Sequence, residues 1–298
     1  MRPAINILIS ATALLMASCS GARHHDDTPE KPVVVVCIAP LSYFAEGIGG
    51  DKVNVEVMAP AGTDPETYEP SMASLRSASQ ASVIFTTGLL PFEEKIARTV
   101  KESSGGKTLN QTLCDSLQLI MGTHGHDEAD PHIWMSLRNA RVMARTVCRA
   151  LTRALPADSD YFRVRLAAME HRLDSLDNVT ATALAPITGS SFLIWHPSLS
   201  YFARDYGLQQ VAIAAENKET SVDALRRRLD RAGSEKAVAL FGQKELDCRL
   251  MSAISGATGL QPVYISPMSP DVEATLSAAT SALVNSRQAG RSTQIINQ

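Results

Sequence analysis

Apolar positions divide the first half of the chain into three predicted strands with helices between them. The β-branched run Val33–Pro40 is typical of a strand covered on both faces, and the runs Val53–Pro60 and Ser82–Gly88 predict two more strands. Helix-like stretches, LSYFAEGIGG and SMASLRSASQA, separate these strands. Such alternation predicts an α/β lobe, and we expect a loop to lead from its third strand to His132.

Two amphipathic helices are predicted next. The first covers Ser136–Leu151, and the second follows Pro156 and meets no glycine or proline before Pro186. A helix from Asp158 to Ala185 would be about 42 Å long, which is enough to run along a whole domain. Its apolar positions step by three or four residues: Phe162, Leu166, Met169, Leu173 and Leu176.

The strand and helix alternation starts again after Pro186. Helices are expected over SLSYFARDYG, from Ser221 to Ala232, between Gly242 and about Thr258, and from Asp271 onward. Strands are expected at Ser191–Pro197, 208–215, Lys236–Gly242 and Gln261–Ser266. The fold class predicted is therefore α/β, with two lobes, each a mostly parallel sheet flanked by helices, joined by one long rigid backbone helix.

The N-terminus resembles a bacterial lipoprotein signal. A short positive start precedes the apolar run Ile5–Ala17, which is too short for a comfortable membrane span, and small residues lead to Cys19. The resemblance implies cleavage that leaves Cys19 lipidated, on an exported protein facing the periplasm or the cell exterior. An ordinary signal peptide with an incidental cysteine is the alternative. The segments expected are a signal peptide (1–18), a lipidated flexible tether (19–32), an N-terminal α/β lobe (33–156), the linking helix (157–185), a C-terminal α/β lobe (186–286) and a disordered tail (287–298).

Composition narrows the choice of partners. The 298 residues are 45% hydrophobic and 20% charged with a net charge of -3, so no basic excess exists to neutralise a nucleic-acid backbone. An exported location permits disulfides, yet no CxxC occurs. We interpret the four remaining cysteines as buried free thiols: Cys37, Cys114, Cys148 and Cys248.

Four groups able to bind a divalent cation follow predicted strands. Open α/β sheets place ligands at the carboxyl ends of their strands, and two such groups come from each half of the chain. Each alone has an ordinary explanation, such as a loop acid, a hydrogen-bonded histidine or a helix cap. Together they predict a metal site in one cleft, because burying them without a cation would be costly. They are Glu66, His132, His196 and Asp271.

Long motifs identify a family resemblance. The stretches "APLSYFAEGIGGDKVNVEVMAPAGTDPETYEPSMASL", "DPHIWMSLRNARVMA", "WHPSLSYFARDYGL" and "YISPMSPD" resemble the lipoproteins of zinc and manganese ABC importers, called cluster A-I or cluster 9 substrate-binding proteins. The resemblance covers roughly residues 33–286. It implies two α/β lobes linked by a rigid helix, with metal in the cleft.

Carried over by position, the resemblance implies a set of metal ligands. His132 in "DPHIW" and His196 in "WHPSLSYFA" match family ligands, while Glu66 stands where the family usually has a histidine. That exchange places a harder donor in the site and puts the metal preference in doubt. Asp271 is the nearest match to the family's fourth ligand, and Glu245 is an alternative fourth ligand or an acceptor that orients His196.

The segment before His132 is rich in acids and histidines. It contains His124 and His126 with Asp127, Glu128 and Asp130. It is similar to a shortened form of the family's histidine-rich loop. We interpret it as an auxiliary loop that delivers metal weakly without belonging to the ordered site.

The resemblance implies capture and delivery of a metal rather than catalysis. The expected function is binding of Zn²⁺ in the cleft and delivery to an ABC importer permease with its ATPase by a monomer anchored through Cys19. Mn²⁺ is the alternative cargo. A zinc hydrolase and a surface adhesin are alternatives from other classes, although no HExxH, GxSxG or Walker-type motif occurs.

Overall fold

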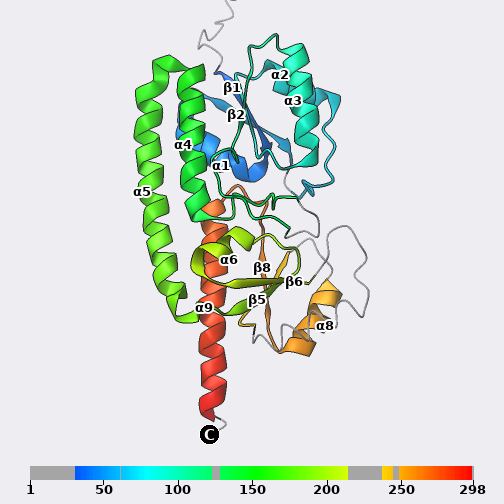
Figure 1. The fold of residues 1–298 in the computed structure, drawn as a ribbon, viewed down its shortest axis with the longest axis vertical. Coiled ribbons are helices and arrows are strands. Elements are labelled where there is room, and N and C mark those ends of the chain that lie inside the picture. Colours follow the sequence, from blue (N-terminus) through cyan, green and yellow to red (C-terminus); the bar gives the residue numbers. More distant parts are fainter. Residues whose placement is uncertain (1–30, 61, 123–127, 214–236, 244–247, 297–298) are drawn as a thin grey trace, which may run out of the picture. The chain divides into compact units, whose positions relative to one another are not determined.

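The structure is a computed structural model that describes residues 31–60, 62–122, 128–213, 237–243 and 248–296. It confirms the expected fold class of two α/β lobes and a long helix (Figure 1). Within the described residues, no helix combines the length and the apolar character that crossing a bilayer requires. The signal peptide, Cys19 and most of the expected tether lie outside the described residues.

The N-terminal lobe is built on a four-stranded sheet in the order β2-β1-β3-β4, and every strand pair is parallel. Five of the six residues of the central strand β1 are buried, as the continuous apolar run predicts. The strands are β1 (Val33–Ile38), β2 (Asn54–Ala59), β3 (Val83–Thr86) and β4 (Leu109–Thr112). The helices are α1 (Ser42–Gly49), α2 (Met72–Gln80), α3 (Pro91–Ser103) and α4 (Leu137–Ala154).

The segment expected to be a loop before His132 contains two further elements. Helix α3 buries Phe92, Ile96 and Val100 against the sheet's core. Strand β4 pairs with β3 but has no fully buried residue, so its sequence LNQT lacks the apolar run of a central strand. The prediction of a loop was wrong here. Strand β4 was missed because edge strands need little apolar character, whereas α3 was missed although its buried apolar residues recur every four positions.

The C-terminal lobe repeats this topology with the order β6-β5-β7-β8, again all parallel. The expected helix Ser221–Ala232 lies outside the described residues. Helix α9 continues past residue 286, so the expected disordered tail is wrong for the residues up to Ile296. The strands are β5 (Ser191–Ile194), β6 (Gln209–Ala212), β7 (Leu240–Gln243) and β8 (Pro262–Ile265). The helices are α6 (Ser200–Tyr206), α8 (Cys248–Thr258) and α9 (Val272–Ile296).

Helix α5 (Ser159–Leu184) joins the two lobes as expected. It is 26 residues long, which corresponds to about 39 Å at the rise of an α-helix. It packs against α1 and α4 of the N-terminal lobe and against α9 of the C-terminal lobe (Figure 1). Phe162, Met169 and Leu173 are fully buried, while Leu166 and Leu176 are partly buried. One helix thus contributes to the packing of both lobes.

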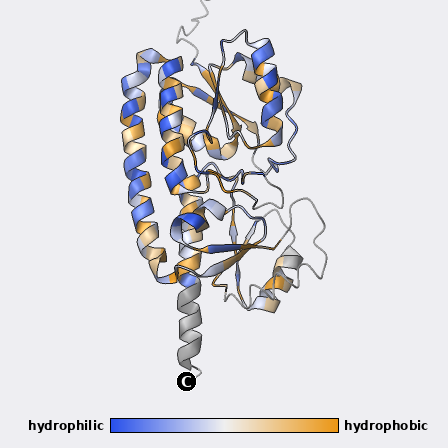
Figure 2. Ribbon diagram, in the orientation of Figure 1, coloured by the Kyte–Doolittle hydropathy of each residue, from blue (hydrophilic) through white to orange (hydrophobic). Residues whose placement is uncertain are grey.

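Apolar positions gather in the strands, whereas hydrophilic positions are frequent in α3, α4 and α5 (Figure 2). The three described cysteine side chains are free thiols. Cys37 and Cys148 are buried as expected, but Cys114 is only half-buried, which corrects that prediction. The Cys248 side chain lies outside the described part of the chain. Burial raises the pKa of the Cys37 thiol, which donates a 2.7 Å hydrogen bond to Glu93 Oε1.

Candidate metal-binding site

Three of the predicted ligands meet at the carboxyl ends of strands from both lobes. Within the described residues, Glu66, His132 and His196 form a group whose donor atoms all lie within 4.8 Å of one another. Glu66 follows β2, His132 follows β4, and His196 comes two residues after β5 ends. In each sheet the first strand has the second strand on one side and the third strand on the other. Open α/β folds bind their ligands at such a switch point in strand order.

The Glu66 loop is held by its own polar residues. Asp64 Oδ1 accepts a 3.0 Å hydrogen bond from the Glu66 backbone N–H, and Asp64 Oδ2 accepts one from Thr67 Oγ1. Tyr68 donates a 2.8 Å hydrogen bond to the Met58 carbonyl, which ties the loop back to β2. Such aspartate-centred turns fix a loop without regular structure. The sequence GTDPETY therefore places a carboxylate in a defined position.

His132 is the most deeply buried of the three, with a side chain that is 4% exposed. Its Nδ1 lies 2.9 Å from Asp130 Oδ1, and the same oxygen accepts a hydrogen bond from the His132 backbone N–H. Nδ1 therefore carries the proton toward the carboxylate, which leaves Nε2 with a lone pair for a cation. Asp130 itself is fully buried. The prediction that Asp130 belongs to an auxiliary loop outside the ordered site is therefore wrong.

His196 brings the C-terminal lobe to the site. Its Nε2 lies 3.1 Å from His132 Nε2 and 3.6 Å from Glu66 Oε1. A tetrahedral zinc ion with ordinary bond lengths holds its ligand atoms roughly 3.3 Å apart. The spacing of the three donors therefore matches a single small cation. A cation held by three side chains retains a further coordination position.

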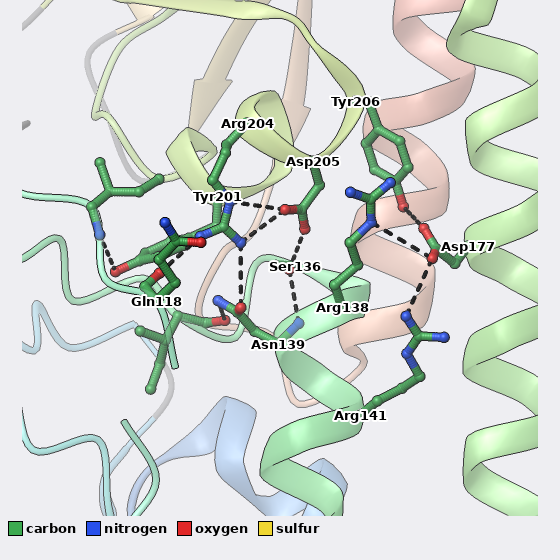
Figure 3. A network of polar contacts seen from close by, with 12 residues as sticks. Gln118, Ser136, Arg138, Asn139, Arg141, Asp177, Tyr201, Arg204, Asp205 and Tyr206 are labelled. Atoms are coloured by element: carbon green, nitrogen blue, oxygen red, sulfur yellow. Dashed lines mark hydrogen bonds and ion pairs between the residues drawn. The ribbon is translucent and has the colours of Figure 1, made fainter. Parts of the chain in front are cut away.

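A polar network ties the segment that carries His132 to helix α6 (Figure 3). Tyr201 donates a 2.8 Å hydrogen bond to the Asp130 carbonyl. Arg204 donates to Asp205 Oδ1 at 2.8 and 2.9 Å and to the Gln118 carbonyl at 2.8 Å. The network joins the loop after β4 to the helix after His196, so the two histidines are held together by contacts that need no metal.

The same network continues onto α4 and α5. Ser136 caps α4 by accepting from the Asn139 backbone N–H, and its hydroxyl donates to Asp205 of α6. On α5, Asp177 accepts a 2.7 Å hydrogen bond from Tyr206 of α6 and lies 3.8 Å from Arg138 Nε (Figure 3). Helix α6 of the C-terminal lobe thus makes polar contacts with both α4 and α5.

Trp134 makes a further contact between the lobes. It is fully buried, and its indole N–H donates a 2.8 Å hydrogen bond to the Pro267 carbonyl in the loop before α9. The polar end of the ring therefore reaches the C-terminal lobe from the segment that bears His132.

The structure does not bring Asp271 into the group of three. Its side chain is exposed, and Oδ1 accepts a 2.9 Å hydrogen bond from the Ala274 backbone N–H, which is the contact of a helix N-cap. Its position after a C-terminal strand suggested a ligand, but its side chain is used to begin α9. The alternative fourth ligand, Glu245, and the auxiliary histidines His124 and His126 lie outside the described residues.

Two site residues were missed in the sequence. Asp130 and Tyr201 both lie inside the quoted motifs, but neither was predicted to position a metal ligand. The short-range signal was available, because an aspartate two residues before a histidine can hold both its backbone and its ring. The contact between Tyr201 and Asp130 spans 71 residues and has no local signal.

Comparison with known proteins identifies the family. Residues 34–283 match the family described as ZnuA, "Zinc-uptake complex component A periplasmic". The chain belongs to this family. A crystal structure of ZnuA superposes with a TM-score of 0.78 and 30% identity, covering 86% of this chain and 99% of that one. The family is described as a component of a zinc-uptake complex.

Two relatives of this chain have names that specify different metals. "Zinc-binding lipoprotein AdcA" of Streptococcus pneumoniae is 28% identical over 88% of this chain and 54% of its own length. "Manganese ABC transporter substrate-binding lipoprotein PsaA" of the same organism is 26% identical over 89% of both chains. This chain spans about half the length of AdcA.

Proposed function

We propose that this chain is an extracytoplasmic binding protein that captures Zn²⁺ between its two lobes and delivers it to the permease of an ABC importer. The observation that carries the proposal is the convergence of Glu66, His132 and His196 from both lobes on one point. Membership of the ZnuA family and the names of the relatives support it.

Zinc is favoured over manganese by the donors. Two imidazole nitrogens and one carboxylate suit the tetrahedral preference of Zn²⁺, whereas Mn²⁺ prefers oxygen donors and more of them. The distance of 3.1 Å between the two nitrogens also suits a small tetrahedral ion. The harder donor at Glu66 works in the opposite direction, so selectivity rests on the two histidines.

The experiment that tests cargo is a competitive titration of chelator-treated full chain with Zn²⁺ and Mn²⁺. We expect one equivalent of Zn²⁺ to bind in preference to Mn²⁺. His132→Ala and His196→Ala should abolish tight binding, while Glu66→His should shift selectivity further toward Zn²⁺. Preferential binding of Mn²⁺ by the unaltered chain would contradict the choice of zinc.

The fourth coordination position is proposed to hold water or Glu245. The sequence suggested Asp271 or Glu245 as the fourth ligand, and zinc titrations of Glu245→Gln and of Asp271→Asn distinguish between these two residues. A loss of affinity in the first variant alone identifies Glu245, and unchanged affinity in both identifies water. A loss confined to Asp271→Asn would contradict this proposal, since the described contacts of Asp271 are those of a helix cap.

Delivery and anchoring are tested in cells. Deletion of the chain should impair growth under zinc starvation, and the unaltered gene should restore growth whereas His132→Ala should not. A labelled fatty acid should be incorporated into the unaltered chain and not into Cys19→Ser if Cys19 bears the lipid anchor. Normal growth of the deletion strain without zinc would favour an adhesin over an importer component.

A further inference from the structure

Helix α4 presents a row of arginines to helix α5. Its 18 residues include five arginines at spacings of three and four and no acid: Arg138, Arg141, Arg145, Arg149 and Arg153. Residues at such spacings lie along one side of a helix. The row is unusual in a chain whose net charge is -3.

Acids of α5 compensate only one end of this row. Arg138 and Arg141 pair with Asp177, Arg141 also pairs with Asp174, and Arg145 pairs with Glu170. One and two turns further toward the start of α5, the corresponding positions are Leu166 and Arg163. The charge pattern of α5 therefore changes from acidic to apolar and then basic.

The uncompensated end surrounds a groove between α4 and α5. Its volume is about 550 Å³, and its lining residues are Arg145, Cys148, Arg149, Thr152, Arg153, Arg163, Leu166 and Glu170. Four arginines face one acid in this lining. Arg149 donates to Thr146 Oγ1, and Arg163 pairs with the exposed Asp160. Within the described residues, no acid pairs with Arg149 or Arg153.

The inner surface of the groove is apolar. Cys148 is buried and Leu166 is half-buried between the arginines. Burial raises the pKa of the Cys148 thiol, so it adds no negative charge to the groove. An arginine rim around an apolar floor suits a ligand that joins a phosphate to hydrocarbon, whereas free phosphate would leave the floor exposed.

The groove lies at the end of the N-terminal lobe where the described chain begins. The Pro32 carbonyl accepts from the Asn54 backbone N–H, and Lys52 pairs at 3.3 Å with Asp158 in the α4–α5 connection. Figure 1 shows the start of β1 and the α4–α5 connection at the same end. A segment anchored to a membrane would therefore enter this lobe beside the groove.

We propose that the α4–α5 groove binds the phosphodiester headgroup of an anionic phospholipid and orients the anchored protein on its membrane. This inference rests on the proposed function only for the anchor at Cys19. Phosphate oxygens would accept hydrogen bonds from Arg149, Arg153 and Arg163, and Thr152 supplies a neutral hydroxyl donor. Each arginine near an anionic surface strengthens membrane partition about fivefold.

The test uses the mature chain, residues 19–298, with Cys19→Ser, so that neither the apolar signal run nor the lipid anchor contributes to vesicle binding. Co-sedimentation is measured with vesicles of phosphatidylglycerol and phosphatidylcholine and with vesicles of phosphatidylcholine alone. We expect binding to the anionic vesicles only, weakened at least tenfold by Arg149→Gln with Arg153→Gln. The matched control is Arg76→Gln with Arg98→Gln on α2 and α3, which removes the same charge and should leave binding nearly unchanged.

Three results would overturn the proposal. These are no binding to anionic vesicles, equal losses in both double variants, or competition by glycerol phosphate at concentrations that imply equal affinity for the soluble anion. Zinc titration of the same preparations keeps the two proposals separate. Intact zinc binding with no vesicle binding would refute only the proposal that the groove binds phospholipid. Vesicle binding without zinc binding would refute only the proposal that the protein captures Zn²⁺.

Discussion

At the scale of single residues, Asp130 determines how His132 can act. Its carboxylate holds both the backbone N–H and the ring Nδ1 of His132, so Nε2 faces His196. Such acceptors orient histidine ligands and raise their basicity. We expect Asp130→Asn to weaken zinc affinity by about 10- to 100-fold. Competition against a chelator of known affinity measures the change, and thermal unfolding of the metal-free variant shows whether the fold is retained.

Asp271 provides a contrasting prediction at the same scale. Because its carboxylate caps α9, Asp271→Ala should lower the free energy of unfolding by about 1 kcal/mol. Zinc affinity should stay unchanged, since the side chain is exposed and directed to the Ala274 N–H. Urea unfolding of the metal-free protein and zinc titration measure the two quantities. A loss of zinc affinity without a loss of stability would reverse the assignment.

How far the sequence predicts the site differs between these residues. The positions of Glu66 and His132 after strands of one sheet predict that these two side chains meet, because parallel strands of an α/β sheet end at the same edge. His196 follows a strand of the second sheet, so its meeting with them depends on how the two lobes face each other. The same rule also selected Asp271, although its side chain is used as a cap. Strand position thus indicates which loops face the cleft but not which side chain in a loop turns toward it.

At the scale of elements, α6 connects the two lobes through its polar face. Tyr201 is fully buried and donates to the Asp130 carbonyl, and burial raises its pKa to about 12. Tyr201→Phe should cost about 1 kcal/mol at neutral pH, since a buried carbonyl loses its donor. Urea unfolding measures this difference in the metal-free protein.

The pH dependence of that difference has a defined sign. Above the ordinary tyrosine pKa the unfolded chain loses the phenolic proton while the folded chain keeps it, so the stability from Tyr201 falls as pH rises. The gap between the unaltered chain and Tyr201→Phe should therefore be constant below about pH 9 and narrow between roughly pH 10 and 12. A gap that widens over this window would show that the hydroxyl is not protected by burial.

The longest apolar patterns predicted their elements, whereas the segment after β3 was expected to be a loop and contains α3 and β4. The run VVVVCI and the repeated spacing of α5 identify their elements directly. Strand β4 has the sequence LNQT and forms only because β3 offers a parallel edge. The pairing of β4 with β3 joins residues far apart in the chain, so the residues around β4 do not predict it.

At the scale of the whole molecule, the lobes are joined by contacts that do not involve a metal. Helix α5 packs against both lobes, α6 bonds to the loop after β4, and Trp134 donates to the Pro267 carbonyl. Two of the three proposed ligands, His132 and His196, lie on these connected segments. Glu66 lies on a separate loop that is turned by Asp64 and contacts β2 and α3 through Tyr68 and Glu69.

This arrangement predicts a small response to metal. Zinc binding should restrain the Glu66 loop further and leave the spacing of the lobes unchanged, because hinge closure would break the buried contacts around Asp205 and Trp134. Small-angle scattering of the metal-free and zinc-loaded chain should give radii of gyration that agree within about 1 Å, whereas closure of two hinged lobes changes the radius by more. Amide exchange should slow in residues 62–70 on zinc binding and change little in α6.

The matched variant Arg204→Ala removes the contacts to Asp205 and Gln118, so it should enlarge the difference in radius of gyration between the metal-free and zinc-loaded states. A large change in the radius of gyration of the unaltered chain would mean that the contacts around α6 break at little cost in free energy. Zinc binding would then close the two lobes as well as fill the site between them.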